Sequence, residues 1–62
     1  MFELYEKVKI KSSGIVGTII DISIINDSAN YVVESDKKNV TDGYGGDWKL
    51  FDCSEEEIEK IA

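Results

Sequence analysis

The side chains that carry out most enzymatic chemistry are scarce in this chain of 62 residues. It has no histidine and one cysteine, Cys53, which we expect to be a small buried packing residue and not a reactive thiol. Pairs of nucleophile and base therefore reduce to serine with lysine. We find no convincing catalytic set in these residues and expect a protein that is not an enzyme.

The segment 36–47 is rich in glycine and in side chains with oxygen ligands, so it is the first place to consider for a metal or phosphate site. The possible cation ligands of this segment are Asp36, Asn39, Asp42 and Asp47. Their spacing does not match the calcium loop of an EF-hand, which also needs a glutamate at its last position. The glycine-rich run 43–46 precedes an expected strand, whereas a phosphate-binding loop precedes a helix. We therefore expect no metal and no cofactor.

Aromatic residues are the stronger candidates for function. Tyr44 lies within the long polar segment 36–47, Trp48 follows it directly, and Tyr5 is close to the first residue. Long loops are often functional, and aromatic side chains are enriched in binding hot spots. The leading hypothesis is a protein-interaction module that uses Tyr5, Tyr44 and Trp48. The alternative for Trp48, a place in the core, stays open at this point.

The chain is acidic, with 13 aspartates and glutamates against 7 lysines and arginines and a formal net charge of -6. Proteins that bind nucleic acid normally carry an excess of basic residues, so the sequence argues against nucleic acid as a partner. Four glutamates near the C-terminus form a candidate acidic surface: Glu55, Glu56, Glu57 and Glu59. They suggest an alternative function, an acidic decoy or inhibitor of the phage type that occupies the nucleic-acid-binding groove of a partner protein.

A run of β-branched residues that ends at Ile25 predicts the central strand of a small sheet. Alternation gives it one apolar face, which we expect in the core: Thr18, Ile20, Ile22 and Ile24. The other face is mixed: Ile19, Asp21, Ser23 and Ile25. Self-association through this mixed face is a third hypothesis, so we expect a monomer or a weak homo-oligomer.

The remaining elements follow from local patterns. Three more strands are expected, at residues 7–11, 31–35 and 48–52. The first should bury Val8 and Ile10, and in the second Tyr31, Val33 and Ser35 share a face. Turn-forming residues connect them at 26–30, and Gly17 predicts a bulge or a positive φ.

The C-terminus has the signature of a short helix. Ser54 and Glu57 fit a capping box, with Ser54 as the N-cap. Cys53 and Ile58 are spaced for a hydrophobic staple. Ile58 and Ile61, three residues apart, should press one or two helical turns onto the sheet.

Size and composition predict one domain over residues 1–62. Hydrophobic residues make up 42% and charged residues 32%, which is typical of a globular chain and not of a disordered one. No apolar run is long enough for a membrane span, and the first residues lack the features of a secretory signal. We therefore expect a cytoplasmic protein that does not associate with a membrane.

These elements predict an all-β fold, a small antiparallel barrel of about five strands with a short C-terminal helical turn. The segments Val8-Lys9-Ile10, 15–22 and 31–34 resemble the V-x-V, G-x-V-G-T-V-x-x-I and Y-x-V-E pattern of SH3-like barrels, in particular of the KOW type. KOW modules occur in ribosomal and transcription-elongation proteins and in short free-standing bacterial proteins. The resemblance implies contacts with RNA or protein through basic loops, so a KOW-like RNA- or ribosome-associated module is a further alternative. The lysines in such positions are Lys9, Lys11, Lys37 and Lys38.

Overall fold

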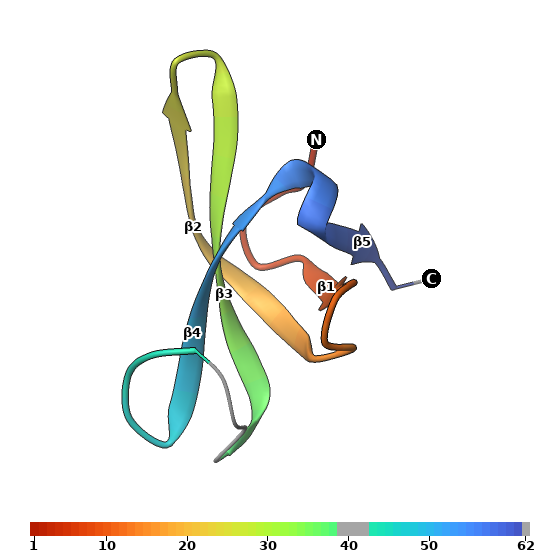
Figure 1. Cartoon of the computed structure of the whole chain (residues 1–62), viewed down its shortest axis with the longest axis vertical. Coiled ribbons are helices and arrows are strands. Elements are labelled where there is room, and N and C mark those ends of the chain that lie inside the picture. Colours follow the sequence, from red (N-terminus) through yellow and green to blue (C-terminus); the bar gives the residue numbers. More distant parts are fainter. Residues whose placement is uncertain (39–42, 62) are drawn as a thin grey trace.

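The computed structural model describes residues 1–38 and 43–61. It contains, in order, β1 (Lys7–Ile10), β2 (Val16–Ile25), β3 (Ser28–Lys38), β4 (Trp48–Ser54), the one-turn 3-10 helix η1 (Glu55–Glu57) and β5 (Ile58–Lys60). The five strands form a single antiparallel sheet in the order β4-β3-β2-β1-β5 (Figure 1). The all-β fold with a short C-terminal helical turn is therefore confirmed.

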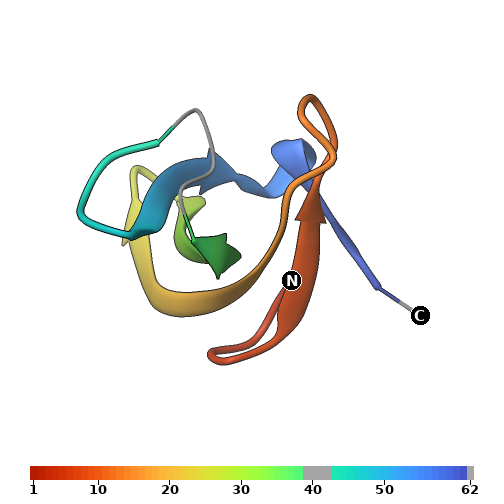
Figure 2. The same cartoon turned by 90° about the horizontal axis from the view of Figure 1, so that it is seen from below.

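The sheet bends strongly but is not closed. Figure 2 shows β2 passing through a wide curve, so that β1 and β5 face the half of the sheet that contains β3 and β4. The two edge strands, β4 and β5, do not pair with each other in the described part of the chain. The core lies inside this bend.

Seven side chains form the buried core: Val8, Ile10, Ile19, Tyr31, Val33, Cys53 and Ile58. The ring of Phe2 packs edge-on against Tyr31, with 5.5 Å between centroids and 89° between planes. The expected burial of Val8 and Ile10 is confirmed, as is the shared buried face of Tyr31, Val33 and Ser35. Regular strands made simple alternation reliable at these positions.

The predicted core face of β2 is wrong before the bulge and right after it at Ile22, which packs against the core. Ile19, which alternation placed on the mixed face, is fully buried, whereas Ile24 is 58% exposed. The pairing explains the difference, because Ile19 lies opposite Val33 and Asp21 opposite Val32, which leaves Ile20 as an extra residue. Such a bulge shifts the alternation by one residue. Ile19 is buried and Ile25 is exposed, so the two do not form the shared surface on which the self-association hypothesis was based.

Gly17 does not form the bulge that the sequence predicted, and its φ is not positive. It is a site of close approach between strands. A Cβ atom at this position would lie 2.7 Å from Cγ1 of Val33 and closer still to the carbonyl oxygen of Glu34. Glycine is therefore required by space and not by backbone conformation.

The connection from β2 to β3 is shorter than predicted. Only Asn26 and Asp27 lie between the strands, with φ values of 51° and 64°. Two successive left-handed residues are typical of a type I′ hairpin turn, and Asn and Asp tolerate this conformation. The residues that follow, Ser28 to Asn30, belong to β3.

The long polar segment 36–47 is also shorter than predicted, because β3 continues to Lys38. Asn39 and Asp42, two of the possible cation ligands, lie outside the described residues. β4 likewise extends beyond residue 52, to Ser54.

The C-terminal helix is one turn long and does not include Ile58. Ile58 has φ -125° and ψ 157°, pairs with Ile10 of β1 and is 2% exposed. The prediction that Ile58 and Ile61 share a helical face is therefore wrong, and Ile61 is 45% exposed. At the edge of β1, Ile58 gains backbone pairing with a strand and its side chain is buried. A longer helix that included Ile58 would lose this strand pairing.

Candidate functional site

The outer side of β4 carries two exposed aromatic rings. Phe51 and Cys53 point into the core, so Trp48 and Leu50 lie on the opposite face of the strand. Trp48 is 44% exposed, which answers the question left open by the sequence: its ring is at the surface and not in the core. We call Tyr44, Trp48 and Leu50 the aromatic surface.

Tyr44 is held on this face by backbone pairing. Its N–H donates to the carbonyl of Leu50 at 3.0 Å, and the N–H of Leu50 donates to the carbonyl of Tyr44 at 2.6 Å. The Tyr44 hydroxyl donates to Oδ1 of Asp52 at 3.0 Å, and this hydrogen bond raises the pKa of Tyr44. Gly43 and Gly45 have φ values of 88° and 106°, which a side chain would strain. The local chain thus fixes the position of Tyr44.

Trp48 is positioned by the end of β3. Lys38 is paired with Trp48, and its Nζ lies 5.5 Å from the centre of the indole ring. A cation over an aromatic face is attracted by the ring. The pairing of β3 with β4 is irregular just before this point, and Ser35 bridges the irregularity by accepting the N–H of Lys49 at 3.1 Å.

Tyr5 lies elsewhere in the molecule. It precedes β1, which β2 and β3 separate from β4 in the sheet. Its N–H donates to the carbonyl of Ile19 at 2.7 Å, and its side chain is 71% exposed. Tyr44 and Trp48 are therefore both neighbours of Leu50 on one face, Tyr44 across the backbone bridge and Trp48 two residues along β4, and Tyr5 is not part of this face.

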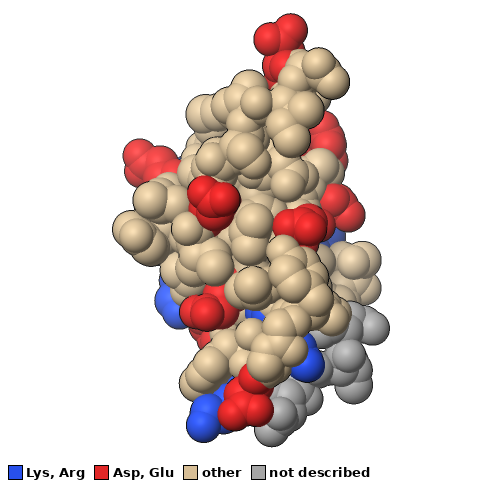
Figure 3. Space-filling model, turned by 90° about the vertical axis from the view of Figure 1, so that its left-hand side faces the viewer, with Lys and Arg blue, Asp and Glu red and all other residues tan. Residues whose placement is uncertain are grey.

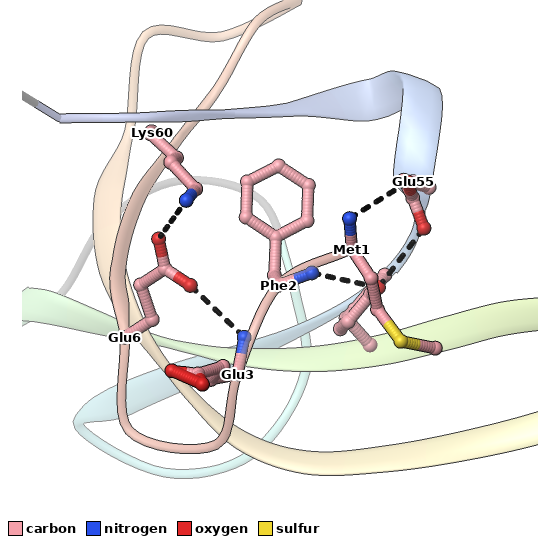
Figure 4. Close-up of polar contacts among 7 residues, drawn as sticks. Met1, Phe2, Glu3, Glu6, Glu55 and Lys60 are labelled. Atoms are coloured by element: carbon pink, nitrogen blue, oxygen red, sulfur yellow. Dashed lines mark hydrogen bonds and ion pairs between the residues drawn. The ribbon is translucent and has the colours of Figure 1, made fainter.

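The glutamates of the candidate acidic surface are largely engaged within the chain. Glu55 accepts a hydrogen bond from the Tyr31 hydroxyl at 3.1 Å, and its Oε2 lies 3.5 Å from the amino group of Met1 (Figure 4). Tyr31 in turn accepts the N–H of Phe2 at 3.2 Å. Glu59 forms an ion pair with Lys9 at 3.5 Å.

Glu57 has a structural partner as well. Its Oε1 accepts the N–H of Ser54 at 2.7 Å, as the capping box predicts. This bond lowers the pKa of Glu57. The hydrogen bond therefore stabilises the fold at pH values above the ordinary glutamate pKa. This contribution to stability is lost as the pH falls through the lowered pKa of Glu57. No internal partner is observed for Glu56 among the described residues.

The lysines on β1 and β5 are also balanced by carboxylates. Lys7 lies 2.8 Å from Asp36, and Lys60 lies 3.8 Å from Glu6. On the face drawn in Figure 3, carboxylates are spread from top to bottom and lysines are mixed with them at the lower end. Positive charge is therefore not gathered into a separate basic surface on this face.

Ser35 and Lys38 have the Ser-x-x-Lys spacing that is found in some enzymes with a serine nucleophile. The sequence analysis did not identify this pair. The Ser35 side chain is 2% exposed and its hydroxyl donates to the carbonyl of Lys37 at 2.8 Å. Lys38 is directed to Trp48 instead. The Ser35 hydroxyl thus links β3 to β4, because it also accepts the N–H of Lys49.

Cys53 should react slowly with a thiol reagent such as DTNB in the native protein. It is 3% exposed, and burial raises its pKa to about 11. At about pH 8 the thiolate fraction is then about a hundred-fold smaller than for an ordinary thiol. Labelling followed by absorbance should be fast in denaturant and at least a hundred-fold slower without it. Equal rates would show that the thiol is not buried.

Two open hollows lie away from the aromatic surface. The first is lined by Ser13, Gly14, Ile15, Val16, Asp36 and Lys37. The second is lined by Asp27, Ser28, Ala29, Ser54, Glu55 and Glu56. Neither contains an aromatic side chain, so the candidate site is an exposed face of the sheet and not a cavity.

Residues 1–38 and 43–61 contain no group of three carboxylate or cysteine side chains arranged to hold a metal ion. The same ranges contain no helix with the length and apolar character that a membrane span requires.

Comparison with models of known protein families, with curated proteins and with solved structures found no significant match. The fold itself defines the class: a small all-β protein built from one bent antiparallel sheet, with an ordered aromatic pair on the outer side of its β4 edge.

Proposed function

We propose that this protein is a non-enzymatic interaction module that binds a segment of another protein on its aromatic surface. The observation that carries the proposal is that Tyr44 and Trp48 are 48% and 44% exposed and are nevertheless held in place by contacts within the chain. Ordered aromatic rings give large contact area at a small cost in conformational entropy. Because these rings are already positioned by contacts within the chain, little of that cost remains to be paid on binding.

The topology supports an SH3-like barrel, and within it a KOW-type module. The strand order β4-β3-β2-β1-β5, the strong bend of β2 and the helical turn before the last strand are all features expected of that barrel. Small barrels of this kind serve as binding modules more often than as enzymes. A cytoplasmic setting, where single free thiols persist, is part of the proposal.

A protein partner agrees better with the charges than RNA does. The chain carries a net charge of -6, and two of the four lysines in the expected RNA-contacting positions have partners within the chain, Lys9 with Glu59 and Lys38 with Trp48. The acidic decoy is also less well supported, because Glu55, Glu57 and Glu59 have partners within the chain. A mimic of phosphates needs carboxylates that face a partner freely.

The proposal predicts that Trp48→Ala abolishes binding and leaves the fold intact. Peptides would be selected from a random library displayed on phage, with wild-type protein as the target. We expect the selected peptides to lose at least ten-fold in affinity for Trp48→Ala and for Tyr44→Ala, because each removes a ring from the contact. Fluorescence anisotropy would measure the affinities and circular dichroism the fold.

Tyr5→Ala is the matched control, since it removes an exposed aromatic ring far from β4. It should bind the selected peptides as wild type does. Equal loss in all three variants, or no enrichment of any peptide, would refute the aromatic surface as the site. Binding that persists at high salt would agree with an apolar contact, and binding that disappears there would favour the glutamates instead.

A further inference from the structure

The second half of β2 is an open sheet edge. β1 pairs with Val16 to Thr18, and the residues before β1 bond to Ile19. Beyond Ile20 the side of β2 that faces away from β3 has no neighbouring strand among the described residues. Figure 1 shows this part of the β2–β3 hairpin rising above the rest of the sheet.

The register identifies the backbone groups that this edge presents. In a hairpin with a two-residue turn, the residues next to the turn form a hydrogen-bonded pair, here Ile25 with Ser28. Hydrogen-bonded pairs alternate along the ladder, so Ser23 with Asn30 is the next such pair. The N–H and C=O groups of Ile22 and Ile24 therefore point away from β3, toward the open edge.

Two features that normally protect a sheet edge, a lysine and a proline, are missing from residues 21–25. The bulge at Ile20 lies before this segment, and Asp21 at its start is its one charged side chain. Ile24 and Ile25 are 58% and 60% exposed. An open, β-branched edge of this kind is a template for another strand.

We propose that the second strand is β2 of another copy of this chain, paired antiparallel about a two-fold axis at Ser23. In this register Ile22 lies opposite Ile24 of the second copy, and Ile24 opposite its Ile22. Each such pair exchanges two backbone hydrogen bonds, which uses every outward group of both residues. The resulting isologous contact closes after two copies.

The sequence of the edge favours a second copy over an unrelated peptide. The two-fold register pairs isoleucine with isoleucine, and β-branched cross-strand pairs stabilise a sheet. It places Asp21 opposite Ile25, so the two aspartates lie at opposite ends of the ladder and do not face each other. A shift by two residues would align Ile22 with the Asn26 turn and lose one of the apolar pairs.

The dimer should be weak and should strengthen with salt. The ladder is about five residues long, which is at the small end of specific interfaces. Each copy carries a net charge of -6, and salt screens the repulsion between them. A basic peptide on the same edge would show the opposite dependence.

Two variants with the same change of charge test the register. Ile24→Lys puts a cation into the isoleucine pair at the edge and should weaken dimerisation at least ten-fold. Ile25→Lys puts the same cation opposite Asp21 of the second copy, where it gains an ion pair, and should dimerise as well as wild type or better. Sedimentation equilibrium between about 10 μM and about 1 mM covers the range of a weak dimer.

Amide hydrogen exchange gives a second readout that a folding defect would not mimic. With rising concentration, the Ile22 and Ile24 amides should become protected, whereas the Ser23 amide, bonded within the hairpin, is protected at all concentrations. A wild-type protein that stays monomeric at about 1 mM in high salt would overturn the proposal. So would loss of dimerisation in Ile25→Lys with dimerisation retained in Ile24→Lys, since that pattern belongs to stacking through the outer face.

Discussion

Gly17→Ala should remove a large part of the free energy of unfolding. The new Cβ would lie 2.7 Å from Val33 Cγ1 and nearer still to the backbone carbonyl of Glu34. A backbone atom between two paired strands cannot turn aside as a side chain can, so β2 and β3 must separate locally. Overpacking of this kind costs about 1–3 kcal/mol. A domain this small has only about 3–5 kcal/mol of stability to lose.

Urea denaturation followed by tryptophan fluorescence would measure the effect. Gly46→Ala is the matched control, because no atom of residues 1–38 and 43–61 lies within 4 Å of a Cβ placed there and its φ is not positive. The midpoint should fall sharply for Gly17→Ala and change little for Gly46→Ala. Similar midpoints for the two variants would show that the strands do not approach as closely as the structure has them.

The strands that simple alternation placed correctly are the regular ones. Val8 and Ile10 flank an outward lysine, and Tyr31, Val33 and Ser35 follow one another at every second residue without a bulge. Where both faces of a strand are apolar, alternation does not tell which face is buried. Trp48 and Leu50 could have been the buried pair in place of Phe51 and Cys53, so the exposure of Trp48 needed the structure.

Pairing between strands that are far apart in the sequence also determines features that local sequence patterns could not predict. The capping box of Ser54 and Glu57 is a local feature and was predictable from the sequence. That the helix ends before Ile58 depends on the free edge of β1, more than forty residues away in the chain. In the same way, Tyr44 owes its position to Leu50 and Asp52, since the glycines around it only permit the turn.

Ile19→Ala and Ile24→Ala should have very different effects on stability, and the comparison tests the bulge directly. Under unbroken alternation Ile24 lies in the core and Ile19 does not. With Ile20 as the extra residue, Ile19 is fully buried against β3, whereas Ile24 reaches past the core and is 58% exposed. The two changes remove the same atoms, so any difference reports their surroundings.

We expect Ile19→Ala to lower the free energy of unfolding by about 2–5 kcal/mol, which is about half or more of the stability of a domain this small. Ile24→Ala should stay within about 0.5 kcal/mol of wild type, as is usual for an exposed site. Both should be measured by thermal denaturation at a low concentration, where a weak dimer at the β2 edge does not contribute. If Ile24→Ala were the more damaging of the two, the alternation of β2 would be unbroken, and the Ile24 side chain would have to be buried in the core instead of 58% exposed.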